Sequence, residues 1–175
     1  VVGPNANLSM TLAGYYGPAN ACGPRRWPTL RDAVANHAYR VVDAMGVRDC
    51  KTNDTSGIDE AVQLARSADT VVCVLGTSLE LAREGIDATE ITLSHAQLEL
   101  AARVASAAKQ PIVVVLMTAT PLDLSALLAN PRIGAILHAG FPSAQAEGVG
   151  DVLFHANGAT PAGRLVQTFY GRSFA

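Results

Sequence analysis

Hydrophobic residues along this chain gather in short runs that alternate with longer amphipathic stretches. The runs are rich in Val, Ile and Leu and end at Gly or at a polar residue. Such runs are typical of strands that are buried on both faces of a parallel sheet. The first predicted strand ends at residue 2, and others span 39–45, 70–75, 112–117 and 133–138. A last strand is predicted at 163–170, where polar and apolar residues alternate.

The stretches between these runs carry apolar residues at the three- and four-residue spacing of amphipathic helices. Two predicted helices open on a capping box, Ser56 with Asp59 and Ser94 with Gln97, and a third has Pro121 at its first position. The predicted helices span 29–38, 56–67, 94–108, 120–130 and 143–155.

Alternation of strands and helices, with connections too long for hairpins, predicts an α/β fold. We expect a three-layer αβα sandwich around a mostly parallel sheet of about six strands. With 175 residues, 49% of them hydrophobic, the chain is expected to form one domain with a sizeable core.

Charge and hydropathy exclude several kinds of partner. The formal net charge is −2, and the longest basic run is Arg25-Arg26. The longest unbroken apolar run, 112–117, is far shorter than the roughly 20 residues that cross a bilayer. We therefore predict neither a nucleic-acid partner nor a membrane partner.

The cysteines and two sequons bear on the compartment. Cys73 lies inside an apolar run and is expected to be a buried thiol, whereas Cys22 and Cys50 can either pair in an oxidising compartment or stay free. Acceptor sequons begin at Asn7 and Asn53 and point weakly to the secretory pathway or the cell exterior. Because the chain opens on Val1 without an initiator Met, we expect it to be a piece of a longer protein.

Familiar catalytic and cofactor motifs are absent from the sequence. Gly3-Pro4-Asn5 is not a phosphate-binding loop, and no Gly-x-Ser-x-Gly motif occurs. The histidines, which are His37, His95, His138 and His155, lack the spacing of metal ligands. We predict no metal and no cofactor, and interpret the histidines as structural, with His138 the least certain because it ends a strand.

The polar loop at 77–93 is the best candidate for chemistry. It follows a buried strand and therefore leaves the sheet at its carboxyl edge, where open α/β sheets bind ligands. Glu80, Glu84 and Asp87 are its first three acids, and a partly shielded carboxyl group here can act as a general acid. From the residues alone, Glu84 and Asp87 can equally be ordinary loop carboxylates.

Several motifs, in a fixed order, resemble a known family. They are VVGPNA at 1–6, AGYYG at 13–17, ARSAD at 65–69 with VVCVLG at 71–76, EGID at 84–87, ITL at 91–93 with Gln97, and GRL at 163–165 with TFY at 168–170. Together they resemble the C-terminal α/β sandwich domain of glycoside hydrolase family 3, the β-glucosidase and β-xylosidase family. The similarity covers nearly all 175 residues, and its opening segment is closer to the β-xylosidase branch.

The resemblance implies a retaining exo-β-glycosidase that removes terminal non-reducing sugars from an oligosaccharide or aryl glycoside. It implies that Glu84 is the acid/base and that Gly85, Asp87 and the neighbouring Arg83 orient the loop or contact the sugar. The Asp nucleophile would come from an N-terminal barrel of the same protein, which this chain lacks. The isolated chain is therefore expected to be inactive.

Three positions depart from the family pattern. Ala88 stands where many members have Arg, Ala82 where β-xylosidases often have Glu, and Val166 where Pro is usual. These departures favour an alternative, a non-catalytic carbohydrate-binding or interaction domain of a degenerate member. A nucleotide-binding or receiver-like α/β domain is a third interpretation, which the missing phosphate loop disfavours.

Overall fold

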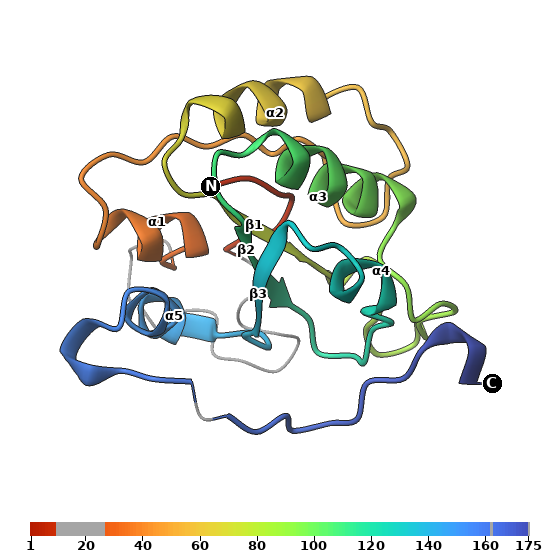
Figure 1. The fold of residues 1–175 in the computed structure, drawn as a ribbon. Helices are drawn as coiled ribbons and strands as arrows, with labels where there is room; N and C mark the ends of the chain where they lie inside the picture. Colours follow the sequence, from red (N-terminus) through yellow and green to blue (C-terminus); the bar gives the residue numbers. More distant parts are fainter. Residues whose placement is uncertain (10–26, 162, 175) are drawn as a thin grey trace.

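The domain consists of a parallel sheet covered by helices on both faces, as the hydrophobic pattern predicts (Figure 1). The structure is a computed structural model, and it describes residues 1–9, 27–161 and 163–174. The sheet has the order β1-β2-β3, formed by Val72–Gly76, Ile112–Met117 and Ile133–His138. Both pairs of neighbouring strands are parallel, with Val72 opposite Val113 and Val114 opposite Ile136.

The two faces of the sheet bury different sets of helices. Side chains of Cys73, Leu75 and Val114 pack with α2, α3 and α4, whereas those of Val74 and Val115 pack with α1 and α5. Strand residues alternate between faces, so each apolar run supplies both cores. The αβα layers are thereby confirmed. The helices are α1 (Leu30–Ala35), α2 (Ile58–Ser67), α3 (His95–Ala107), α4 (Ser125–Leu128) and α5 (Ala146–Leu153).

The predicted number of strands is wrong, because the described chain has three strands instead of about six. Val2 makes parallel bridges to Cys73 on one side and to Ala44 on the other, so 1–2 and 39–45 contribute one bridging residue each. A turn begins at Gly3 and Pro4 has no N–H to pair, which ends the ladder after Val2.

The predicted strand at 163–170 does not form. Leu165 and Val166 are 63% and 89% exposed, and a cavity of about 330 Å³ lies between this segment and β3. Alternation of polar and apolar residues predicts which face is buried, but a strand also needs a neighbour within hydrogen-bonding distance. The cavity, which is lined by Ile136, His138 and Phe169 among others, separates the two backbones.

The helix starts were predicted with mixed success. Ser94 caps α3 as expected, since its Oγ accepts from the Gln97 N–H at 3.4 Å. Ser56 is not a cap, because α2 begins after Gly57 and the Ser56 N–H donates to the Asp54 carboxylate at 2.9 Å. The helix expected from residue 120 begins only at Ser125.

Two further observations concern the environment of the chain. Within the described ranges, no helix is long and apolar enough to cross a membrane. Cys50 is a buried free thiol and so is Cys73. Cys22, the other member of the bridge considered from the sequence, lies outside the described residues.

Candidate functional site

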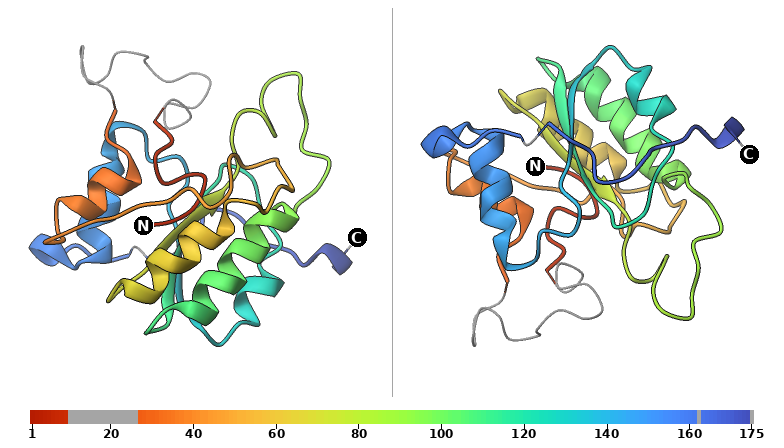
Figure 2. Two further views of the ribbon diagram at one scale, coloured as in Figure 1. Left: turned by 90° about the horizontal axis from the view of Figure 1, so that it is seen from above. Right: turned by 90° about the horizontal axis from the view of Figure 1, so that it is seen from below.

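Residues 77–93 form an arm that stands away from the body of the domain at the carboxyl edge of the sheet (Figure 2). At its tip the backbone reverses in a tight turn. The Arg83 N–H donates to the Ile86 carbonyl and the Ile86 N–H donates to the Arg83 carbonyl, both at 2.9 Å. Glu84 and Gly85 are the central residues of this turn. Gly85 has φ +76°, a left-handed conformation that Gly adopts without the steric cost of a Cβ.

The four residues named from the sequence therefore lie together on the arm. Arg83, Glu84, Gly85 and Asp87 are all exposed. The Arg83 guanidinium donates to the Leu79 carbonyl at 2.9 Å, so this side chain folds back along the arm and braces the turn. Glu84 is thus exposed at the centre of a braced turn, and Asp87 follows the turn on the return limb.

The outgoing limb of the arm is anchored by a buried polar network. Gln97, fully buried at the start of α3, accepts from the Gly76 N–H at 2.9 Å and donates to the Gly76 and Cys50 carbonyls at 3.0 and 2.9 Å. The Thr77 hydroxyl donates to the Thr118 hydroxyl at 3.0 Å, which joins the ends of β1 and β2. One backbone N–H, two backbone carbonyls and two hydroxyl groups thereby find partners at the base of the arm, where burying them without partners would be costly.

Asn5 and Cys50 extend this network on the other side of the arm. The Asn5 side-chain amide donates to the Thr77 carbonyl at 3.0 Å, and its oxygen accepts from the Cys50 thiol at 3.2 Å. Burial raises the pKa of the Cys50 thiol to about 12, although hydrogen bonds with Ser78 and Asn5 oppose this shift. Cys50 therefore stays protonated and acts as a hydrogen-bond donor rather than as a nucleophile.

Sequence reasoning missed this network, apart from noting Gln97. The capping-box pattern assigned the Gln97 side chain to the helix start, whereas the structure turns it toward β1. Its partners are 21 and 47 positions away, so no local pattern indicates them. Asn5 carries a weak signal, since a buried amide directly after Gly3-Pro4 needs a partner.

The return limb has a separate attachment. The Asp123 N–H donates to the Ile91 carbonyl at 2.6 Å, and the Arg172 guanidinium lies 3.4 Å from the Glu90 carboxylate. Asp123 follows β2 by six positions and Arg172 is close to the end of the chain. The arm is therefore attached to the domain at two places. One is the buried Gln97 network at the end of β1, and the other is the exposed contact of Ile91 and Glu90 with Asp123 and Arg172.

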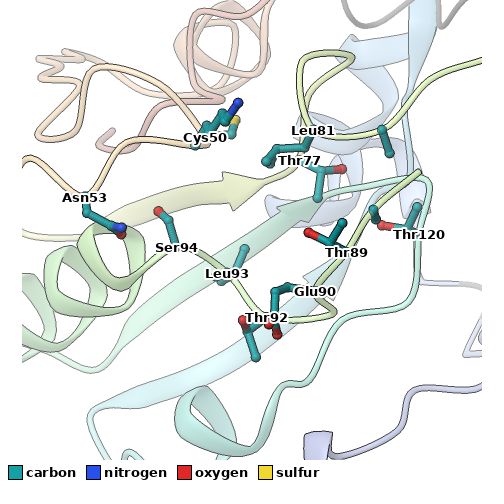
Figure 3. A pocket seen from close by; sticks show the side chains of 13 residues that line it. Cys50, Asn53, Thr77, Leu81, Thr89, Glu90, Thr92, Leu93, Ser94 and Thr120 are labelled. Carbon is teal, nitrogen blue, oxygen red and sulfur yellow. The ribbon is translucent and has the colours of Figure 1, made fainter. Parts of the chain in front are cut away.

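A cavity of about 210 Å³ lies between the limbs and the sheet edge (Figure 3). Much of its lining is hydroxyl groups, from Thr77, Thr89, Thr92, Ser94 and Thr120. Ala82 and Ala88, two of the three positions that depart from the family pattern, also line it. The cavity therefore occupies the space that larger side chains at these positions could enter.

The histidines have structural surroundings. His138 packs edge-on against Phe169 with ring centroids 5.2 Å apart, and burial lowers its pKa against the opposing effect of a hydrogen bond to the Thr118 backbone. His37 lies 3.0 Å from Asp151, and His95 lies 3.3 Å from Glu99. His155 Nδ1 lies 2.9 Å from the Ala159 carbonyl. In the part of the chain that the structure describes, no group of three or more His, Cys, Asp or Glu could hold a metal ion.

Comparison with known proteins identifies relatives over the whole chain. The profile of the Glycosyl hydrolase family 3 C-terminal domain matches residues 1–173. A probable beta-D-xylosidase 7 of Arabidopsis thaliana is 36% identical over 176 residues, which cover 99% of this chain and 22% of the relative. A probable exo-1,4-beta-xylosidase of Aspergillus flavus is likewise 36% identical, with 99% of this chain and 22% of the relative covered. The chain thus spans about a fifth of the length of these relatives.

Solved structures show the same fold. A GH3 exo-beta-xylosidase in complex with a xylobiose aziridine activity-based probe superimposes with a TM-score of 0.84 at 29% identity, covering 97% of this chain and 21% of that protein. A beta-glucosidase from Listeria innocua in complex with isofagomine gives a TM-score of 0.71 at 23% identity, covering 91% of this chain and 21% of that protein. The second match supports the fold alone.

Proposed function

We propose, starting from the fact that this chain belongs to the glycosyl hydrolase family 3 C-terminal domain family, that its parent protein is a retaining exo-β-glycosidase of β-xylosidase type. In this proposal the chain supplies the acid/base Glu84, and an N-terminal barrel supplies the Asp nucleophile. The observation that carries the proposal is the position of Glu84 in an exposed, braced turn of the arm that follows β1.

The position of Glu84 suits a site shared between two domains. Retention requires the two carboxyl groups to be only about 5–5.5 Å apart, so a carboxyl group from this domain has to be carried across to the barrel. An arm with an anchored base and an exposed tip does this, because its base fixes the direction and its tip meets the partner.

The proposed reaction has two steps. In the first, the nucleophilic carboxylate forms a bond to the anomeric carbon while the glycosidic C–O bond breaks, and Glu84 gives its proton to the leaving oxygen. In the second, Glu84 takes a proton from water as the water oxygen attacks the same carbon and releases the enzyme carboxylate. Each step inverts the anomeric centre, so the overall result is retention.

The remaining residues of the tip have supporting roles in this proposal. Gly85 allows the turn that presents Glu84, and Arg83 braces it through the Leu79 carbonyl. Asp87 orients the return limb or accepts from a sugar hydroxyl. An oligosaccharide or aryl β-glycoside is the proposed substrate, and exposed sequons at Asn7 and Asn53 support a secretory or extracellular location.

The test replaces Glu84 by Gln in the full-length parent. For phenyl β-xyloside, whose leaving group needs a proton, kcat/KM should fall on the order of 10²- to 10⁴-fold, the usual contribution of general acid catalysis. For 2,4-dinitrophenyl β-xyloside, which needs no protonation, kcat/KM should change little. Azide should raise the turnover of the variant and yield a β-xylosyl azide, because azide attacks without a general base.

The matched control is Glu80→Gln, the same chemical change on the outgoing limb of the arm, which should leave both substrates unaffected. Undiminished hydrolysis of phenyl β-xyloside by Glu84→Gln would refute the assignment.

The alternative, a non-catalytic carbohydrate-binding or interaction domain, is favoured by Ala82 and Ala88, which remove two polar side chains from the cavity under the arm. It predicts that the full-length parent binds xylo-oligosaccharides in calorimetry without cleaving them. Release of xylose from the same oligosaccharides excludes it.

A further inference from the structure

The outgoing and return limbs of the arm are attached to the domain by different numbers of buried contacts. The outgoing limb continues β1 directly and is held by the buried Gln97 network. The return limb is exposed from residue 83 to Ile91 and becomes buried only at Leu93. Two contacts join it to the rest of the domain near its end, through the Ile91 carbonyl and the Glu90 carboxylate. The groups that hold these two residues therefore help to set the direction of the arm.

Asp123 joins three segments by hydrogen bonds: the return limb of the arm, the start of α4 and the C-terminal tail. Its backbone N–H donates to the Ile91 carbonyl at 2.6 Å on the arm. Its carboxylate Oδ1 accepts from the Ser125 N–H at 2.8 Å, where α4 begins, and Oδ2 accepts from the Arg172 N–H at 2.9 Å on the C-terminal tail. The carboxylate thus locks the backbone of Asp123, and the locked backbone holds the arm.

The charge of Asp123 is consistent with this arrangement. Hydrogen bonds from the Ser125 side chain, the Arg172 backbone and the Ser125 backbone lower the pKa of the Asp123 carboxyl group. The group is therefore ionised near neutral pH, where it acts only as an acceptor. Arg172, placed by this carboxylate, in turn extends its guanidinium to Glu90.

We propose that Asp123, acting with Arg172, is a positioning residue that sets where the arm holds Glu84. The inference rests on the proposed role of Glu84 as the acid/base. Asp123 does not touch the reacting atoms, and it acts by fixing the backbone from which the tip projects. Because catalysis depends on near-attack geometry, a displacement of about 1 Å at the tip can lower a rate by roughly 100-fold.

This role predicts a selective kinetic defect. A misplaced acid impairs only reactions that need its proton, so phenyl β-xyloside should be affected and 2,4-dinitrophenyl β-xyloside should not. A merely structural role would instead lower the active fraction of the enzyme, which reduces kcat/KM for both substrates by the same factor. The ratio of the two kcat/KM values therefore distinguishes positioning from folding.

The experiment measures this ratio in variants of the full-length parent. Asp123→Ala removes both carboxylate acceptors, and Asp123→Asn keeps one amide oxygen as an acceptor. Arg172→Ala removes the guanidinium that contacts Glu90 but keeps the N–H that donates to Asp123, whereas Arg172→Pro removes both. The matched control is Lys109→Gln, since Lys109 makes a comparable exposed ion pair, 3.1 Å from Asp69, just before β2 at the opposite edge of the sheet.

We expect Asp123→Ala to lower kcat/KM for phenyl β-xyloside by about tenfold relative to the dinitrophenyl substrate, with Asp123→Asn intermediate. Arg172→Pro should have a larger defect than Arg172→Ala, and Lys109→Gln none. Equal loss on both substrates, or a ratio for Asp123→Ala equal to that of the control, would overturn the proposal. Glu84→Gln is measured alongside. If Glu84→Gln hydrolyses phenyl β-xyloside as fast as the unsubstituted protein, the acid assignment and the positioning role both fail. If Glu84→Gln is impaired on this substrate but Asp123→Ala is not, only the positioning role fails.

Discussion

Gly76 is the residue at which β1 ends and the arm begins, and a side chain does not fit there. A Cβ added to Gly76 would lie 2.0 Å from the Met117 carbonyl oxygen of β2. The φ of Gly76 is +152°, outside the range that other residues usually adopt. Close approach of the two strands at their carboxyl ends therefore depends on Gly at this position.

Replacing Gly76 by Ala should consequently destabilise the domain. The new methyl group has to displace backbone rather than a flexible side chain, so we expect a loss of about 3 kcal/mol or more in the free energy of unfolding. Gly148→Ala is the matched control. Gly148 lies in α5 with nothing within 4 Å of an added Cβ, so this change should stabilise by about 0.5–1 kcal/mol. Thermal unfolding of both variants of the parent checks the contrast, and a Gly76→Ala protein as stable as the control would contradict it.

Residue-level predictions from the sequence were accurate where local chemistry decided them. The stop at Gly76 and the polar residues after it predicted a loop at the carboxyl edge of the sheet, which the structure contains. Glu84 lies there in an exposed turn instead of the partly shielded surroundings considered from the sequence. The role of Asp123 was not predicted, because Ile91 and Arg172 reach it from distant parts of the chain. Side-chain partners that are set by tertiary packing leave no spacing in the sequence.

The start of α3 shows how one element can fix two others. Gln97 lies in its first turn, yet its side chain forms hydrogen bonds with Gly76 at the end of β1 and with Cys50 in the preceding loop. The helix, the strand and the loop are therefore joined at one buried amide. An amide suits this position because it offers both an acceptor and a donor.

Replacing Gln97 by Leu should break this junction. The buried Gly76 N–H and two carbonyl groups would lose their partners, and each unsatisfied group costs about 1–3 kcal/mol, so we expect a loss of at least about 3 kcal/mol. Hydrogen exchange of peptides spanning residues 72–78 should accelerate more than that of peptides from α2. Unchanged protection of residues 72–78 would show that the junction does not hold the base of the arm.

The Gln97→Glu variant should have a stability that depends on pH. A buried carboxylate facing two carbonyl oxygens favours its protonated form, so its pKa in the folded state should rise above the unfolded value of about 4.3. The protonated group can donate to one of the two carbonyl oxygens, and its stabilisation is complete below the unfolded pKa. Thermal stability of this variant should fall relative to the unsubstituted protein as the pH rises from about 4 to 7. A constant difference between the two proteins would contradict this.

Element boundaries were predicted best where a single local interaction decides them. Ser94 caps α3 as its spacing suggests, because the cap and its partner are neighbours on the chain. The expected start at residue 120 was wrong because the Thr118 hydroxyl binds the Thr120 backbone and Asp123 binds the Ser125 N–H, which delays α4. Competing hydrogen bonds of short polar side chains decide such cases, and they depend on the surrounding strands.

For the whole molecule, hydrophobic periodicity predicted the layers better than the extent of the sheet. Runs buried on both faces became β1 and β2, with helices on each side, because burial alone gives such runs their composition. The strands predicted for the edges of the sheet did not form, since pairing there depends on whether a neighbouring strand lies within hydrogen-bonding distance. Val2 and Ala44 take part only in isolated bridges, and residues 163–170 are separated from β3 by a cavity.

The proposed division of labour between two domains predicts how the isolated segment 1–175 behaves. Glu84 is exposed in the turn of the arm, as are Gly85, Ile86 and Asp87 beside it, so these four residues do not by themselves enclose a sugar. Retaining hydrolysis also needs a second carboxylate about 5–5.5 Å away to form the covalent intermediate. A xylose-configured aziridine, which alkylates the nucleophile, should therefore label the full-length parent and leave the isolated segment unlabelled.

Mass spectrometry measures this outcome directly. The label on the parent should map to a peptide outside residues 1–175, and the isolated segment should release no xylose from phenyl β-xyloside. Circular dichroism of the segment controls for folding, since an unfolded segment would be inactive for a trivial reason. A label attached to Glu84 or Asp87, or turnover by the folded segment, would show that this domain carries the nucleophile itself. Labelling confined to the rest of the parent would place the covalent step outside residues 1–175. The arm would then contribute proton transfer, which an exposed carboxyl group on an anchored base can perform across a domain boundary.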